Sequence, residues 1–412
     1  MEEMLDSLWP LITAPWTLAP DTLLGAAVLA VIAALAGEAV WRLLRWPRLV
    51  GYALVGTALA IAGRGAEGNE PALRVAIDGA LALLLFEAGA RLRLRWLVSN
   101  PWLLVTSIAE ALLAGVAVMV VLTALGLGAN VATPLAILAV CVSPAVLQRV
   151  VGELHAAGQV TERLLALAAL NTLYAVLAMK LLSAGLLLSD PRTWLDALSP
   201  VLFSFCGSIL LGAALGEGLA LIARRFDLRD DNAMVLLLAA VLLALVLAKT
   251  LQLSALLVPL LAGIWLANRS ERPWVWPRHF GSAGSVLVLV MFVAVSSAWT
   301  FEALSAAAGL ALALVVARAL AKGLAVLATA RPSGLGLRQA ACLAVSLTPM
   351  SATAWVLAMD FSAQHPETGA RLMPVMLAAI AMLELAAPLV VMAGLRAAGE
   401  VDRQPPRPEA LR

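Results

Sequence analysis

Charged residues are scarce in this chain. Only 13% of its 412 residues are Asp, Glu, Lys or Arg, whereas 62% are hydrophobic, and the mean hydropathy is +0.95. A soluble domain carries about 25% charged and about 45–50% apolar residues. The composition therefore excludes a soluble globular domain and predicts an integral membrane protein embedded in a lipid bilayer. The net charge of +2 gives no reason to expect a nucleic-acid partner.

Cysteine and recognisable motifs are also lacking. The three cysteines (Cys141, Cys206 and Cys342) lie in apolar stretches and show neither a metal-binding spacing nor a disulfide framework. No glycine-rich nucleotide motif follows a strand pattern, and no nucleophile–base set is visible. We therefore expect no enzyme, no cofactor and no metal other than a transported Na⁺ or K⁺.

Signals at the two ends of the chain are absent as well. Residues 1–21 contain no Lys or Arg, unlike a cleavable signal peptide, which begins with basic residues. The segment after Gly399 is too short for a soluble regulatory domain. We therefore expect residues 1–412 to form a single transmembrane transporter domain.

Long apolar segments are abundant. A helix needs about 20 apolar residues to cross a bilayer, and only helices and closed barrels can span one. Because no barrel-like alternation occurs, we predict an all-α protein with about 13 transmembrane helices. The predicted spans are 22–41, 48–63, 72–90, 101–126, 131–152, 161–188, 197–223, 232–249, 253–268, 282–298, 303–328, 337–358 and 371–397.

The basic residues of the loops predict the orientation. With these thirteen spans, 20 of the 28 Lys and Arg residues fall in the odd-numbered loops and the C-terminal tail, and only five fall on the other side. Cytoplasmic loops carry the excess of Lys and Arg. The N-terminus is therefore predicted to be outside and the C-terminus inside.

Two spans contain a proline beside hydroxyl residues at mid-depth. Pro144 follows Ser143 in 131–152, and Pro349 lies between Thr348 and Ser351 in 337–358. Proline removes a backbone donor, so each helix is expected to break there. Matched interrupted helices in two halves of a chain indicate the substrate site of a transporter built from inverted repeats.

The neighbouring spans carry unusual polar residues. Asn171 and Thr172 lie in the span 161–188, directly after the first broken helix. Arg318 and Lys322 lie in the span 303–328, directly before the second. Arg318 is closer to mid-depth, whereas Lys322 could instead extend to the cytoplasmic interface. Lys180, near the outer end of 161–188, is expected to anchor at the interface.

Five stretches, taken together and in order, resemble the monovalent cation:proton antiporter superfamily, which has the sodium/proton exchanger fold. They are "RWPRLVGYALVGTALA" (45–60), "LALLLFEAGARLRLRWL" (81–97), "SPAVLQRVVGELHAAGQVTERLLALAALN" (143–171), "LQLSALLVPLLAGIWLAN" (251–268) and "ELAAPLVVMAGLRAAGE" (384–400). The resemblance implies thirteen helices, two broken helices that cross near the ion site, and a core that moves against a dimerisation domain. It also implies a homodimer in the bacterial inner (cell) membrane.

The sequence departs from this family at one position. In the family, the helix that corresponds to 161–188 carries an Asp-Asp or Asn-Asp pair, whose second aspartate binds the cation and the proton in turn. Asn171 matches the first residue, but Thr172 replaces the essential carboxylate. A threonine can offer an oxygen to a sodium ion but cannot carry the proton.

Another acid is therefore needed if the protein exchanges protons. Intramembrane acids are functional candidates by default, and we consider Asp78, Glu110 and Glu384. Glu110 lies about ten residues into its span, about 15 Å deep at 1.5 Å per residue. Asp78 and Glu110 are the preferred substitutes, while Glu384 matches a recurrent Glu-x-x-x-Pro pattern of the family.

Three functions remain open at this point. The first is exchange of sodium or potassium for protons at a modified site, where carbonyl groups of the broken helices would coordinate the cation. The second is transport of an anion or organic solute, because Arg318 and Lys322 would make the site positive. The third is a membrane sensor that transports nothing. The residues proposed for the ion or substrate site are Ser143, Pro144, Asn171, Thr172, Arg318, Lys322, Thr348, Pro349 and Ser351.

Overall fold

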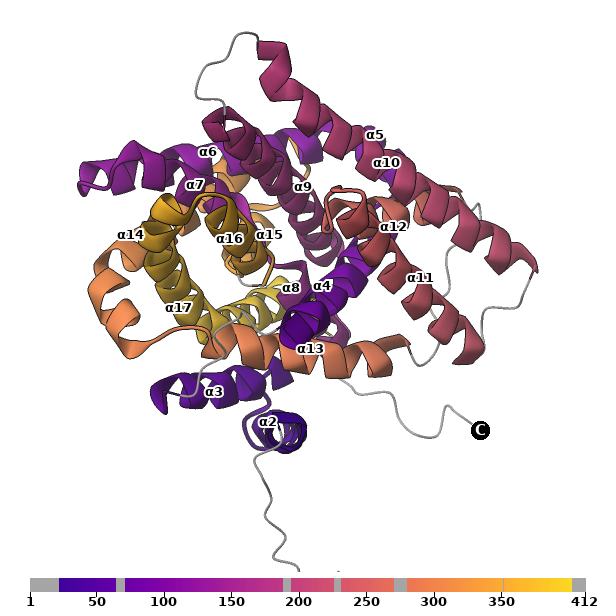
Figure 1. The fold of residues 1–412 in the computed structure, drawn as a ribbon, viewed down its shortest axis with the longest axis horizontal. Helices are drawn as coiled ribbons and strands as arrows, with labels where there is room; N and C mark the ends of the chain where they lie inside the picture. Colours follow the sequence, from indigo (N-terminus) through magenta and orange to yellow (C-terminus); the bar gives the residue numbers. More distant parts are fainter. Residues whose placement is uncertain are drawn as a thin grey trace, which may run out of the picture.

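The computed structural model describes residues 22–63, 71–187, 194–225, 231–269, 280–350 and 352–401. This part of the chain is helical and contains no strand (Figure 1). The helices are α2 (Thr22–Leu44), α3 (Arg48–Ile61), α4 (Pro71–Arg91), α5 (Leu94–Ser99), α6 (Pro101–Ala124), α7 (Ala129–Val140), α8 (Pro144–Leu154), α9 (Gln159–Leu187), α10 (Trp194–Arg225), α11 (Asp231–Thr250), α12 (Leu257–Arg269), α13 (Phe280–Ser297), α14 (Phe301–Ala330), α15 (Leu337–Ser346), α16 (Ala352–Gln364) and α17 (Pro366–Ala398).

The all-α membrane fold predicted from the sequence is confirmed. Seven helical stretches in the described residues are long and apolar enough to cross a membrane, and four shorter apolar helices accompany them. Every predicted span coincides with a helix or with a pair of half-helices, and the short helix α5 was not predicted. The count of thirteen crossings and the orientation remain predictions.

The helices pack in two groups (Figure 1). One group, which we call the core group, contains α6–α9 and α14–α17, and in it α14 packs extensively against both α6 and α17. The other, the flanking group, contains α2–α4 and α10–α13, with α4 packed against α12 and α12 against α10. The stretch Ala129–Leu154 in the core group is mostly buried, whereas α2 is mostly exposed, so α2 lies at the periphery.

Within the core group, two units of three helices repeat the same pattern. In each unit a broken helix lies between two unbroken ones: α7 and α8 between α6 and α9, and α15 and α16 between α14 and α17. The breaks occur at the predicted prolines. α7 ends at Val140 and α8 begins at Pro144, while α15 ends at Ser346, just before Pro349.

The two breaks touch each other. The backbone N–H of Ser143 donates to the carbonyl oxygen of Pro349 at 3.0 Å. Backbone groups freed inside a membrane must find partners within the protein. Contact between the breaks satisfies part of this requirement and places four helix ends at one point of the core group.

Candidate ion site at the helix breaks

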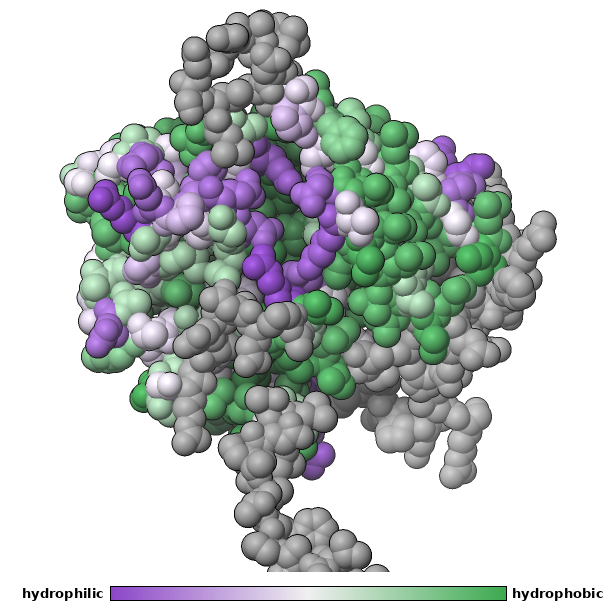
Figure 2. All heavy atoms as spheres, viewed as in Figure 1, coloured by the Kyte–Doolittle hydropathy of each residue, from purple (hydrophilic) through white to green (hydrophobic). Residues whose placement is uncertain are grey.

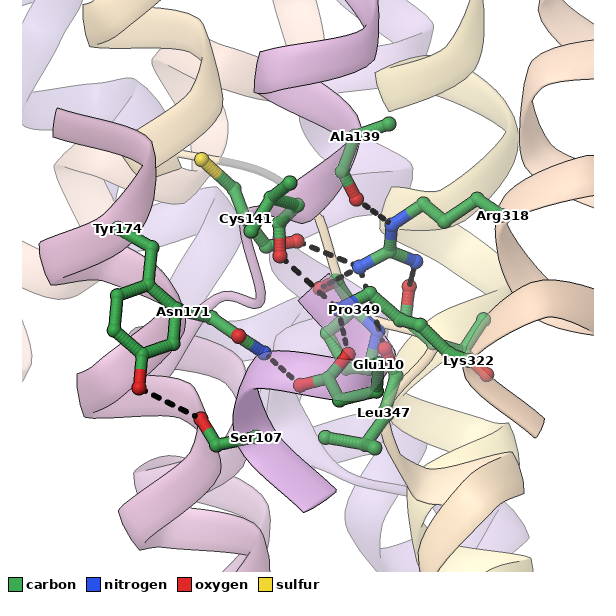
Figure 3. A network of polar contacts seen from close by, with 12 residues as sticks. Ser107, Glu110, Ala139, Cys141, Asn171, Tyr174, Arg318, Lys322, Leu347 and Pro349 are labelled. Atoms are coloured by element: carbon green, nitrogen blue, oxygen red, sulfur yellow. Dashed lines mark hydrogen bonds and ion pairs between the residues drawn. The ribbon is translucent and has the colours of Figure 1, made fainter. Parts of the chain in front are cut away.

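Glu110 is the buried carboxylate at the centre of a polar network (Figure 3). It projects from α6 and its side chain is fully buried. One carboxylate oxygen accepts a hydrogen bond from Nδ2 of Asn171 at 2.5 Å, and the other forms an ion pair with the ammonium of Lys322. Glu110 therefore connects α6 to α9 and α14, next to the pair Asn171–Thr172.

Lys322 has no path to the membrane surface. Its side chain is 1% exposed, and besides Glu110 its ammonium donates to the carbonyl oxygen of Val140 at 3.1 Å. From the sequence, Lys322 could have extended to the cytoplasmic interface. The structure instead buries its side chain in the core group. Its partners are within the core because α6 and α14 pack closely and α7 ends beside them.

Arg318, one turn away from Lys322 on α14, binds the ends of both broken helices. Its guanidinium donates to carbonyl oxygens of Ala139 (2.7 Å), Cys141 (2.6 Å), Leu347 (3.3 Å), Thr348 (2.7 Å) and Pro349 (3.3 Å). The last carbonyls of a helix lack intrahelical partners and carry its negative dipole end. A guanidinium has five N–H donors and can therefore bond to several of these unpaired carbonyls at once. Carbonyls that we expected to coordinate the cation thus accept hydrogen bonds from Arg318.

Asn171 and Thr172 are both fully buried on α9, but their roles in the structure differ. Asn171 uses its amide nitrogen on Glu110, and its Oδ1 has no hydrogen-bond donor within the described residues. The hydroxyl of Thr172 donates to the carbonyl oxygen of Ala168, one turn back on the same helix, at 3.0 Å. Asn171 therefore retains a free oxygen for a ligand, whereas Thr172 is bonded to its own helix.

The remaining predicted residues surround the breaks. The hydroxyl of Ser143 caps the N-terminus of α8, whose first residue is Pro144. The hydroxyl of Thr348 donates to the backbone of α15, and the carbonyl of Pro349 accepts from both Ser143 and the guanidinium described above. Ser351 lies outside the described residues.

The three candidate acids lie in different places. Glu110 is at the breaks. Asp78, on α4, forms an ion pair with Lys249 of α11 in a separate cavity. Glu384 is buried in α17 and lies outside the network drawn in Figure 3. Of these acids, the structure brings only Glu110 into contact with Asn171.

Four hydroxyl groups that sequence reasoning missed form two further pairs between helices that carry the network. Ser107 donates to the hydroxyl of Tyr174 at 3.3 Å, and Thr106 donates to that of Thr329 at 2.8 Å. Ser107 precedes Glu110 by three residues, and residues three or four apart share one face of a helix. This spacing was the available signal, but hydroxyl residues also occur on helix faces that bind nothing.

The described residues contain no group of three or more His, Cys, Asp and Glu side chains that could hold a metal ion. The network contains one carboxylate, one amide oxygen and one ammonium, beside a guanidinium that is bonded to backbone carbonyls. Such a set can bind a monovalent cation in place of the ammonium, and it can take up or release a proton.

Comparisons with known proteins agree on the family. The family model for the transmembrane part of sodium/hydrogen exchangers matches residues 27–393. Two structures of the sodium proton antiporter MjNhaP1 from Methanocaldococcus jannaschii are similar. One, at pH 8, has 16% identity and a TM-score of 0.61 and covers 92% of this chain and 95% of the other. The second, from electron microscopy, has 15% identity and a TM-score of 0.73 and covers 94% and 99%. No curated protein sequence matches.

These structural likenesses, at low identity, show the fold. The family model shows the relationship, because it covers most of the chain, including both breaks and the helices that carry Glu110, Asn171 and Lys322. The chain belongs to the sodium/hydrogen exchanger family.

Proposed function

We propose that this protein is a secondary active transporter that exchanges sodium or potassium ions for protons, with the Glu110–Lys322 pair in place of the missing aspartate. Family membership supports antiport in general. The observation that carries the specific proposal is a fully buried carboxylate bonded to both Asn171 and Lys322 beside the helix breaks.

The cation binds to oxygens that are already in place. Glu110 supplies the negative charge, and the free Oδ1 of Asn171 supplies a neutral ligand. Burial strengthens the attraction between this carboxylate and a bound cation, because charges interact more strongly away from water. A dehydrated cation at this position competes directly with the ammonium of Lys322.

The proton leaves from the ammonium that the cation displaces. The cation takes the place of the ammonium on Glu110, and Lys322 becomes a neutral amine by releasing one proton. Re-protonation of Lys322 restores the ion pair and expels the cation. A buried lysine can lose its proton, which an arginine cannot do under physiological conditions.

The same exchange fixes the stoichiometry. Glu110 and Lys322 together are neutral when the ion pair is formed, and they are neutral again with one bound cation and an uncharged amine. One cation therefore replaces one proton, and the site carries the same charge in both directions. We expect an electroneutral 1:1 antiporter.

Movement of the core group against the flanking group gives alternating access. At the end predicted to be cytoplasmic, α8 bonds to the flanking group. Gln148 donates to the carbonyl oxygen of Leu84 at 3.1 Å, and Glu153 accepts from the backbone N–H of Arg48 at 2.9 Å. At the other end a cavity separates α9 and α16 from α4 and α11. This arrangement is that of a state closed to the cytoplasm.

A second candidate function is supported by the charge count. Arg318 and Lys322 against Glu110 leave one positive charge at the site, which favours an anion or an acidic solute. Against it, the guanidinium is already bonded to five backbone carbonyls and the ammonium to Glu110. We therefore prefer the cation. A homodimer and a bacterial inner-membrane location follow from the family resemblance and remain predictions.

Proteoliposomes test the proposed activity. The purified protein is reconstituted with a pH-sensitive dye inside, and Na⁺, K⁺ or a series of anions is added outside. We expect Na⁺ or K⁺ to drive proton efflux at a rate that does not change when the membrane potential is clamped at different values. A change of internal pH that follows the anion rather than the cation would support the second candidate, and no flux above empty liposomes with any ion would favour a sensor.

A further inference from the structure

The cavity that holds Asp78 and Lys249 opens between the core and flanking groups, away from Glu110. It measures about 310 Å³ and is lined by residues of α4, α9, α16 and the α11–α12 connection. Hydrophilic side chains surround a hollow in this face of the molecule (Figure 2). The arginine distribution predicts that this face is outside, so we call the cavity the outer vestibule.

Among the described residues, five charged side chains line the outer vestibule, and four of them are paired. Arg74 bonds to Asp360 at 2.5 Å, and Lys249 forms an ion pair with Asp78. Lys180 also lines the cavity, near Asp360, but forms no ion pair or hydrogen bond within the described residues. The formal charge of the five side chains is therefore +1, and Lys180 is the side chain that carries the excess.

A positive vestibule is an unusual entrance for a cation. Like charge lowers the local concentration of a cation and raises that of an anion. An ammonium with three donors and no bonded acceptor is suited to an oxyanion, and charge-assisted hydrogen bonds of this kind are the stronger ones. The cavity is about ten times the roughly 30 Å³ that a water molecule occupies in the liquid, so a small anion fits with part of its hydration shell.

We propose that the outer vestibule is a binding site for a small oxyanion, of the size of phosphate or a short carboxylate, held mainly by Lys180. The site is separate from the ion site, because Lys180 lies eight residues beyond Thr172 on α9, about 12 Å at 1.5 Å per residue. The bound anion cancels the excess positive charge beside the route to the ion site. The inference does not depend on antiport, since the vestibule and its charges are present whatever the protein transports.

The rarity of lysine gives a direct test. The chain has only three lysines, two of which line the outer vestibule, while Lys322 is buried. The protein in detergent is treated with an amine-acylating reagent, with and without phosphate as its triethanolammonium salt. Mass spectrometry measures acylation at each lysine. A reporter lysine at an exposed position outside the vestibule, Arg95→Lys, serves as the control for ionic strength.

We expect phosphate to slow acylation of Lys180 severalfold while the reporter lysine reacts at an unchanged rate. Equal slowing at both positions, or no slowing at either, would overturn the proposal, because neither result indicates a site at Lys180. Acetate in place of phosphate shows whether a carboxylate is also accepted.

Two variants measure binding itself by calorimetry with phosphate. Lys180→Gln removes the charge and is expected to weaken binding by about tenfold or more, as loss of a charge-assisted contact does. Lys180→Arg keeps the charge and is expected to bind phosphate. Binding that is equal in wild type and Lys180→Gln would contradict the proposal. No flux is measured in either experiment, so failure of the proposed antiport would leave these outcomes unaffected.

Discussion

At the scale of single residues, the main finding is that a carboxylate lies beside Asn171 although Thr172 is not an acid. The carboxylate comes from a different helix, since Glu110 projects from α6 and reaches α9. The sequence could indicate Glu110 as a substitute because an acid at mid-depth in a membrane helix is costly without a partner. It could not choose between Glu110 and Asp78, because both lie in apolar spans and only packing shows which one meets Asn171.

Lys322 is the residue that distinguishes two ways of carrying the proton. In the variant Lys322→Arg the ion pair with Glu110 can persist, but the guanidinium cannot release a proton. We expect cation-driven proton flux to fall to background while the protein still elutes as a folded species. Flux that survives in Lys322→Arg would show that Glu110 itself carries the proton.

Thr172 gives a second prediction at this scale. The residue is fully buried and contacts only its own helix through its hydroxyl. An aspartate there would be a second buried carboxylate that competes with Glu110 for Lys322, and an uncompensated buried charge costs several kcal/mol. We expect Thr172→Asp to lower exchange in the proteoliposome assay. Strongly increased exchange would mean that Thr172 is merely a lost acid in an otherwise ordinary site.

At the scale of helices, the breaks explain why Arg318 is buried. The two half-helices α7 and α15 end inside the core group, and their last carbonyls would be unsatisfied in an apolar environment. Arg318 provides the donors for both ends at once. We infer that it holds the crossing of the broken helices and does not bind the transported ion, which answers a question that the sequence left open.

Close contact between α4 and α12 holds the flanking group together. A Cβ added at Gly263 would lie 2.1 Å from the carbonyl oxygen of Phe86, and one at Gly89 would lie 2.0 Å from that of Leu260. Small residues at helix interfaces let membrane helices approach closely. The two glycines therefore set the distance between α4, which carries Asp78, and α12.

Gly263→Ala should accordingly destabilise the protein, by about 1–3 kcal/mol as overpacked sites do. The measurement is thermal unfolding of the purified protein in detergent. Gly218→Ala, in α10, is the matched control, because a Cβ there meets nothing within 4 Å, and helix propensity alone should leave the protein as stable or slightly more stable. Equal stability of wild type and Gly263→Ala would contradict the assigned packing.

Some features of the helices could be predicted from the sequence and others could not. Helix positions and both breaks could be predicted, because apolar length and proline act locally. The ion pairs Arg74–Asp360 and Lys249–Asp78 could not, because each joins residues that are far apart in the chain and whose proximity depends on how α4, α11 and α16 pack. For the same reason the sequence could not indicate that Lys180, which is expected to anchor at the interface, also lines the outer vestibule.

At the scale of the whole molecule, the arrangement of the two helix groups around the proposed ion site is consistent with transport. The proposed ion site lies within the core group, the outer vestibule opens between the groups, and α8 bonds to α3 and α4 at the opposite end. In the proposed mechanism the site carries the same charge in both loaded states, so a complete exchange cycle moves no net charge across the membrane. We therefore expect coupling to depend on the Glu110–Lys322 pair rather than on the membrane potential.

The most direct measurement of this account is cation-driven proton flux in proteoliposomes that contain Glu110→Gln. Asp78→Asn and Glu384→Gln, which alter the other two candidate acids, are measured in parallel, and size-exclusion chromatography checks that each variant is folded. The account predicts that Glu110→Gln reduces exchange to the level of empty liposomes while Asp78→Asn retains it. Full exchange in folded Glu110→Gln, or its loss only in Asp78→Asn or Glu384→Gln, would contradict it.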